Sequence, residues 1–105
     1  MSEHFLYPVI MKKRRGGSYF VEVVDFPLSC TQGEDFEDAF FMAKDCICHR
    51  IYAYRKQGIP LPKPSDKPDR RLTKSERFIE IAVNYGQWLE ETADLEPLEI
   101  GMSHA

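Results

Sequence analysis

Two runs near the amino terminus are rich in aromatic and β-branched residues, and their pattern predicts a β-hairpin. The runs are FLYPVIMK (5–12) and SYFVEVVD (18–25). Gly16 and Gly17 lie between them and readily adopt the positive φ angles that a tight turn requires. Pro8 cannot donate a hydrogen bond to a strand ladder, so we expect pairing of the first strand to begin after it.

The second of these runs alternates, which assigns its side chains to two faces of the sheet. One face carries only aromatic and aliphatic side chains and is expected to face the core. The other face is half polar, and we expect it to take part in self-association into a dimer or tetramer. The residues of this second face are Phe20, Glu22 and Val24.

A long amphipathic helix is predicted at 36–57. Acidic residues gather at its start, where Asp35 is a candidate N-cap with Asp38 three residues later. Gly58 and Pro60 are typical of the end of a helix. Apolar residues recur between these ends at intervals of three and four and form one stripe: Phe36, Ala39, Phe40, Ala43, Ile47, Ile51 and Tyr54.

Four other segments complete the predicted architecture. A short strand is expected at 28–32, a proline-rich connector at 59–75, a strand at 77–83 and a short helix at 85–92. The fold class is therefore α+β. We predict a four-stranded sheet, with three antiparallel strands plus one after a crossover, and the long helix packed on one face.

Composition narrows the class of protein further. The chain has 105 residues, 43% of them hydrophobic and 30% charged, which suits one folded domain. Its apolar runs are too short for a membrane span, and its amino terminus does not resemble a signal peptide. Three cysteines, an odd number, favour a reducing compartment, so we expect a cytoplasmic protein.

The carboxy-terminal segment is acidic. We expect residues 1–89 to form the folded domain and 90–105 to form a flexible tail. The tail contains five acids and no lysine or arginine: Glu90, Glu91, Asp94, Glu96 and Glu99.

Two stretches combine several short motifs in a fixed order: YPVIMKKRRGGSYFVEVVDFPLSCTQGEDFEDAFFMAKD (7–45) and GIPLPKPSD (58–66). The motifs are, in order, a Tyr-Pro strand, a glycine turn, Tyr-Phe-Val-Glu, Asp-x-Pro, Cys-Thr-Gln-Gly and a proline-rich link. Together they resemble the HicB family of bacterial antitoxins over roughly residues 5–85, although Leu28-Ser29-Cys30 stands where the family has Pro-Gly-Cys. The resemblance implies a truncated ribonuclease-H-like fold without that enzyme's catalytic set.

The resemblance also implies a partner, a small mRNA-cleaving toxin of the HicA type that the protein binds and silences. Many relatives continue into a carboxy-terminal ribbon–helix–helix or helix-turn-helix domain that binds operator DNA. Only 22 residues follow Val83 here, and they are acidic. Because an acidic segment repels phosphate, we do not expect this chain alone to bind operator DNA.

The residues offer little support for catalysis. Glu22 and Asp25 are three apart on a strand and point to opposite faces, and the acids at 34–38 are explained by the helix start. Cys46 and Cys48 project about 200° apart on a helix and cannot chelate one ion. We predict no catalytic residue, metal or cofactor. The alternatives are a degenerate ribonuclease-H-like hydrolase and an adaptor that has lost its toxin.

The long helix carries more apolar residues than one sheet contact requires, which indicates a second packing partner. We expect Phe41, Cys48 and Tyr52 to belong to a subunit or toxin interface, the alternative being scattered surface residues. The acids of the tail are expected to meet the basic surface of an RNA-binding toxin, or to serve only as a solubilising tail.

Basic residues form two groups in the sequence. Lys12 to Arg15 occupy the predicted hairpin tip, and others lie along the connector. Either group is a candidate for phosphate contact, but no aromatic residues interleave with the connector cations, so a solvated charged loop is the simpler interpretation. The connector group comprises Lys63, Lys67, Arg70, Arg71, Lys74 and Arg77.

Overall fold

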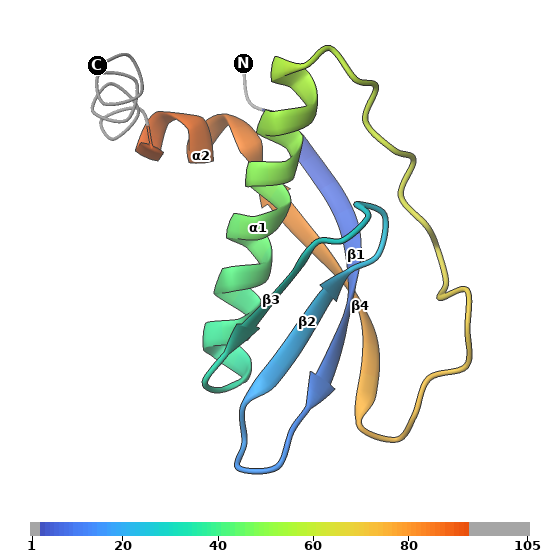
Figure 1. Ribbon diagram of the computed structural model, residues 1–105. Coiled ribbons are helices and arrows are strands. Elements are labelled where there is room, and N and C mark those ends of the chain that lie inside the picture. The colour runs from blue at the N-terminus through green and yellow to red at the C-terminus, as the bar shows by residue number, and fades with distance from the viewer. Residues whose placement is uncertain (1–2, 93–105) are drawn as a thin grey trace.

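A four-stranded antiparallel sheet with a long helix along one face forms the computed structural model, which describes residues 3–92 (Figure 1). The strands lie in the order β3-β2-β1-β4, and this arrangement confirms the predicted α+β class. The elements are β1 (His4–Lys13), β2 (Tyr19–Val23), β3 (Cys30–Gly33), α1 (Phe36–Lys56), β4 (Glu76–Asn84) and α2 (Tyr85–Thr92).

The longest strand, β1, lies in the middle of the sheet and pairs on both sides. It pairs with β2 from Val9↔Val23 to Lys13↔Tyr19, and with β4 along almost its whole length. The predicted hairpin is confirmed, with Gly16 at φ 92° and Gly17 at φ 96° in its turn. The chain therefore builds its sheet around its first strand.

Pro8 lies inside β1. Pairing with β2 begins at Val9, directly after Pro8 as predicted, whereas pairing with β4 extends back through Pro8 to His4. Pro8 pairs with Glu80 of β4, and its carbonyl accepts a hydrogen bond from Val24 N at 3.2 Å. Because the N and C=O of one strand residue point to the same side, the nitrogen of Pro8 faces the β2 side. Strand β2 has already ended at Val23, so the missing donor interrupts no regular ladder.

Both ends of α1 are capped as the sequence predicts. Asp35 Oδ1 accepts from Asp38 N at 2.8 Å, and Asp38 Oδ2 accepts from Glu34 N at 2.9 Å. At the other end Gly58 has φ 72°, and Ile59 N donates to the carbonyl of Tyr54 at 2.8 Å. This is the glycine-terminated pattern that satisfies the last carbonyls of a helix.

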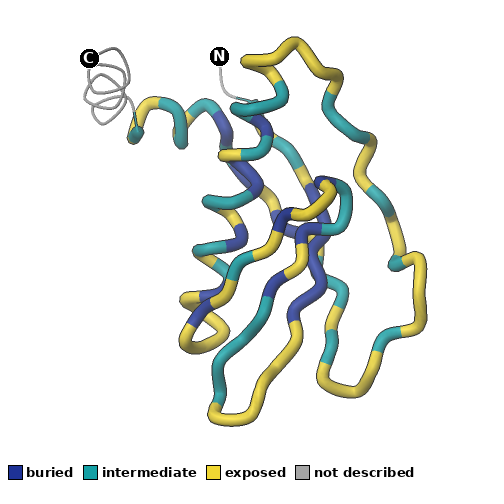
Figure 2. The backbone as a smooth tube through the Cα atoms, in the orientation of Figure 1, coloured by how far each residue is buried: buried dark blue, intermediate teal, exposed yellow. Residues whose placement is uncertain are grey.

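The core lies between α1 and the sheet, where Figure 2 shows the buried stretches of both meeting. Most of the predicted helical stripe is buried there, but Phe36 is 46% exposed because it lies at the very start of the helix. Its ring packs edge-on against Tyr19 of β2, with ring centroids 5.6 Å apart. The buried helix residues are Ala39, Ala43, Ile47, Cys48 and Ile51.

The connector 59–75 contains no helix or strand but is anchored to the domain at three points. Tyr7 Oη donates to the carbonyl of Pro62 at 2.6 Å, and Ser65 binds the carboxylate of Asp25 through its N–H and its hydroxyl. Arg70 then donates to Glu22 of β2 and to Glu76 of β4. Since β1 lies between those strands, this bridge spans the face of the sheet that α1 leaves uncovered.

The bridge predicts a measurable pH dependence. Hydrogen bonds from the Arg70 guanidinium and from the Thr73 amide lower the pKa of Glu76 to about 2, against its ordinary value of 4.5. Because the folded-state pKa is depressed, the bridge stabilises the fold fully above about pH 4.5 and is lost as the pH falls through about 2. In an NMR titration of the Glu76 carboxyl, Arg70→Ala should move the midpoint toward 4.5. Arg71→Ala, the neighbouring exposed control, should not, and an unchanged midpoint in Arg70→Ala would contradict the bridge.

Candidate protein-binding surface

The short helix α2 packs against α1 through the single tryptophan of the chain. The Trp88 indole N–H donates to Asp45 Oδ1 at 3.0 Å, and its ring meets that of His49 edge-on at 4.8 Å between centroids. On its other side Trp88 stacks on Tyr85 at 5.8 Å. Asn84 caps α2, since its Oδ1 accepts from Gln87 N at 3.0 Å. Helix α2 is thus a second packing partner of α1 within the same chain.

This packing also determines how far two residues of the predicted interface are exposed. Cys48 is only 3% exposed and belongs to the core of the single chain, but it also lines the groove between α1, α2 and the end of β4, so its place in an interface stays a prediction. Burial raises the pKa of its thiol to about 12, which keeps it protonated at neutral pH and unsuited to bind a metal. Tyr52 is half-buried, with its ring 6.3 Å from that of Trp88. The surplus apolar side chains of α1 are explained partly by α2.

Phe41 remains exposed, at 66% of its surface. It lies at the edge of a groove of about 400 Å³ between α1, α2 and the end of β4. The groove has an apolar floor and a mixed polar rim, the combination that protein interfaces favour. Sequence patterns could not reveal it, because α2 meets α1 only in the folded chain. Its principal lining residues are Phe41, Val83, Trp88, Lys44, Gln87 and Glu91.

The acids that were predicted to face a toxin divide into two sets. Glu90 and Glu91 belong to α2 and are exposed. Glu91 accepts a hydrogen bond from Gln87 at 2.9 Å and lines the groove. The other three acids, Asp94, Glu96 and Glu99, lie outside the described residues.

The uncovered face of the sheet carries the residues predicted for self-association. Phe20 is half-buried beneath the guanidinium of Arg14, which lies 4.8 Å from the ring centroid, and Glu22 is bound by Arg70. Val24 is half-buried beside them. Leu28 follows in a turn at φ 60° and is fully exposed. The hairpin and the connector thus cover part of this face and leave an apolar margin open.

The carboxylates considered for catalysis have structural partners. Glu22 is bound by Arg70, and both oxygens of Asp25 accept hydrogen bonds from Ser65. Across residues 3–92, no three His, Cys, Asp or Glu side chains lie close enough together to hold a metal ion. Within that range the structure also contains no helix with the length and hydropathy needed to cross a membrane.

The contact between the helices predicts a stability loss in Asp45→Ala. This change leaves the partly buried indole N–H of Trp88 without its acceptor, so we expect a loss of about 1–2 kcal/mol in the free energy of unfolding. Urea unfolding followed by the fluorescence of Trp88 measures it directly. Asp69→Ala, in the exposed connector, serves as the control and should change the free energy by less than about 0.5 kcal/mol. An equal change in the free energy of unfolding for Asp45→Ala and Asp69→Ala would contradict the contact between Asp45 and Trp88.

Comparison with known proteins now identifies the family. Residues 6–83 match the family model described as the HicB_like antitoxin of bacterial toxin–antitoxin systems, which is well over half of the chain. The chain belongs to the HicB-like antitoxin family. This result confirms the resemblance carried by the motifs from Tyr7 to Ser65, and the match ends at Val83, the last buried residue of β4.

One curated protein and two solved structures are similar to this chain in sequence or in fold. The chain is 38% identical over 60 residues to Antitoxin HicB 1 of Photorhabdus laumondii, a match that covers 55% of this chain and 39% of that protein. A chain of a toxin–antitoxin complex from Streptococcus pneumoniae shares the fold, with a TM-score of 0.68 and 20% identity over 82% of this chain and 73% of that one. A chain of a HicA3 and HicB3 toxin–antitoxin complex has a TM-score of 0.52 and 25% identity, over 75% of this chain and 95% of that one.

Proposed function

We propose that this HicB-like protein neutralises a small mRNA-cleaving toxin of the HicA type by binding it and covering its RNA-binding surface in the cytoplasm. The family match across residues 6–83 carries the proposal. Two chains from solved toxin–antitoxin complexes resemble the fold, which supports it. The action is stoichiometric, because the protein contributes a surface and performs no chemistry.

The groove beside Phe41 is the surface we assign to the toxin. An exposed aromatic ring over a partly apolar groove suits an anchor residue, since aromatic side chains dominate binding energy in protein interfaces. A ribonuclease that grips RNA presents basic residues, and Glu90 and Glu91 lie on the helix that borders this groove. Opposite charges of this kind accelerate association and exclude RNA phosphates.

Self-association is the second part of the proposal. The open margin of the sheet around Phe20, Val24 and Leu28 is apolar and lies apart from the groove. We assign it to contacts between copies of this chain in a dimer or tetramer. Light scattering of the purified protein measures its oligomeric state. A monomeric mass at micromolar concentration would contradict self-association and leave the proposal on toxin binding unaffected.

Co-expression with the adjacent gene tests the proposed function most simply. A toxin encoded there should arrest growth when expressed alone, and this chain should restore growth and co-purify with it in a fixed ratio. If this chain binds no small basic protein encoded by a neighbouring gene, the result would favour an adaptor that has lost its toxin. A Mg²⁺-dependent nuclease activity of this chain, lost in Glu22→Gln or Asp25→Asn, would instead favour a hydrolase.

The acidic end of α2 predicts a salt-dependent association rate. Replacing both Glu90 and Glu91 by glutamine should slow association with the toxin and flatten its dependence on ionic strength, because long-range attraction between opposite charges is screened by salt. Stopped-flow measurement through the Trp88 fluorescence gives the rates. Changing Asp66 and Asp69 in the connector to asparagine removes the same charge elsewhere and should leave the rate unchanged.

A further inference from the structure

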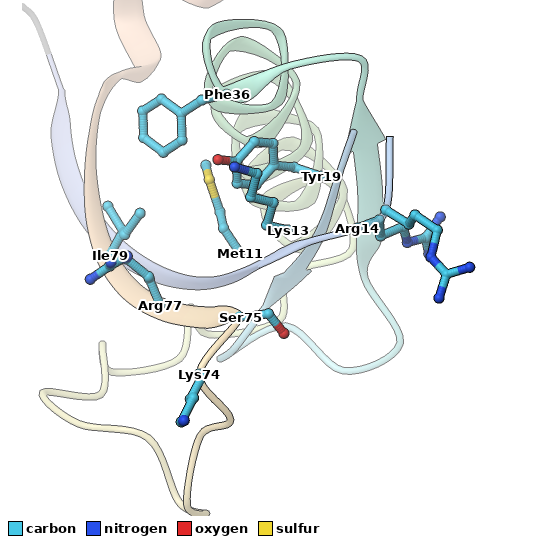
Figure 3. Close-up of a pocket in the computed structure, with 10 residues that line it drawn as sticks. Met11, Lys13, Arg14, Tyr19, Phe36, Lys74, Ser75, Arg77 and Ile79 are labelled. Atoms are coloured by element: carbon cyan, nitrogen blue, oxygen red, sulfur yellow. The ribbon is translucent and has the colours of Figure 1, made fainter. Parts of the chain in front are cut away.

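A second cavity, of about 470 Å³, lies near the tip of the β1–β2 hairpin (Figure 3). This tip is at the opposite end of the sheet from α2 (Figure 1). It occupies a corner on the helix side of the sheet, bordered by the start of α1. Met11 and Ile79 form its floor, and Tyr19 and Phe36 border it with aromatic rings. Its volume is within the roughly 300–1,000 Å³ typical of small-ligand sites.

The fold brings together at this cavity two basic segments that are far apart in the sequence. Lys13 and Arg15 come from the hairpin, and Lys74 and Arg77 come from the end of the connector and the start of β4. A backbone hydrogen bond from Lys13 N to the carbonyl of Ser75, at 2.9 Å, holds the two segments side by side. Arg14 also lines the cavity, but its guanidinium lies over Phe20 and points away in Figure 3, where the side chain of Lys74 likewise extends away from the aromatic rings at the outer margin of the cavity.

The charge of this cluster is uncompensated within the part of the chain that the structure describes. No carboxylate from residues 3–92 lines the cavity, and none lies within ion-pair distance of its four cations. By contrast, Arg55 is bound by Glu3, and Arg70 is bound by two carboxylates. Clustered like charges repel one another, and a bound polyanion relieves that repulsion.

We propose that this cavity binds a short stretch of single-stranded nucleic acid. The phosphates lie on the side of Lys13, Lys74 and Arg77, and an unstacked base packs against the exposed ring of Phe36. A cationic groove with aromatic side chains is the combination that single-stranded nucleic acids require, and paired bases of a duplex do not present a free face to such a ring. Acids of the first turn of α1 flank Phe36, which directs the phosphates toward the hairpin side.

Fluorescence anisotropy with labelled single-stranded RNA and DNA of one mixed sequence tests this site, with duplex DNA as a third probe. We expect single strands to bind more tightly than the duplex, and the RNA and DNA arms identify which strand is preferred. Three phosphate contacts predict a slope of about −2 for log K against log salt concentration, since each contributes about −0.7.

Matched variants separate the site from general electrostatics. Lys74→Ala with Arg77→Ala should weaken binding at least about tenfold and reduce the salt slope by about 1.4, which is twice the contribution of one contact. Lys63→Ala with Lys67→Ala removes the same charge from exposed connector positions and should leave affinity nearly unchanged. Phe36→Leu should weaken binding about fivefold or more through lost stacking. Circular dichroism verifies the fold of each variant. If the variant with Lys74→Ala and Arg77→Ala is unfolded, the double variant Lys13→Ala with Arg15→Ala takes its place.

Three results would overturn the proposal. The first is that single strands do not bind at about 50 mM salt. The second is an equal loss of affinity in the two double variants. The third is that polyphosphate or polyglutamate, which have no bases, binds as tightly as single-stranded nucleic acid. Toxin neutralisation should be unaffected in Lys74→Ala with Arg77→Ala, because the Phe41 groove has no lining residue in common with this cavity. Failure of this site would therefore be distinguishable from failure of the proposed function.

Discussion

The Phe41→Asp variant is expected to fold normally and to lose toxin neutralisation. Phe41 exposes 66% of its surface in the free chain, so its replacement should change the free energy of unfolding by only about 0.5 kcal/mol. In the complex we assign it the role of an anchor, and removing an aromatic anchor costs about 2–4 kcal/mol of binding. The dissociation constant should rise about 30- to 1,000-fold.

Isothermal titration with the purified toxin measures this loss, and growth rescue reports it in cells. Ile59→Asp is the matched control, since it places the same charge at another exposed apolar residue, 43% exposed and located just after α1. We expect Ile59→Asp to bind like the unmodified chain. Normal affinity in Phe41→Asp would remove the groove as the toxin site and leave the family assignment intact.

The Gly33→Ala variant is expected to lose much of the stability of the domain. Gly33 ends β3 where the strand passes directly under the backbone of α1, and a β-carbon there would lie 2.3 Å from Ala39 N and 2.5 Å from Ala39 Cα. Neither backbone can move without separating α1 from the sheet. Because overpacking costs about 1–3 kcal/mol and occasionally more, we expect a loss of about 3 kcal/mol or more in the free energy of unfolding.

Gly17→Ala provides the control for Gly33→Ala. Gly17 has φ 96° in the hairpin turn, and no atom lies within 4 Å of a β-carbon built on it. Its substitution should therefore cost only the conformational term of about 1–2 kcal/mol. Urea unfolding followed by Trp88 fluorescence compares the two variants. A loss in Gly33→Ala that does not exceed that in Gly17→Ala would show that the helix and strand do not approach as closely as described.

Local patterns predict the elements of this fold well. Periodicity and capping residues predict α1 within a residue of its observed end and α2 at Tyr85–Thr92, because the signals for a helix lie within the helix itself. The motifs from Tyr7 to Ser65 likewise predict the family. The pairing of Pro8 with β4 is not predicted by the sequence, because the tolerance of proline in β1 depends on where β2 ends, which is a property of the neighbouring strand.

Contacts between distant segments account for what the sequence did not predict. Cys48 has the spacing of a surface residue on α1, yet it is buried by the packing of the folded chain around α1. Lys13 and Arg77 belong to separate basic groups in the sequence, but they line one cavity because β4 pairs with β1. The candidate sites are thus set by strand order and helix packing, which periodicity alone does not encode.

Titration of toxin ribonuclease activity with the purified chain tests the central claim most directly. The toxin concentration is set well above the dissociation constant of the complex. Cleavage of mRNA should then fall linearly as this chain is added and stop at a fixed molar ratio, and the chain alone should leave the RNA intact. Cleavage that persists at large molar excess of the folded chain, or phosphodiester cleavage by the chain itself, would contradict it.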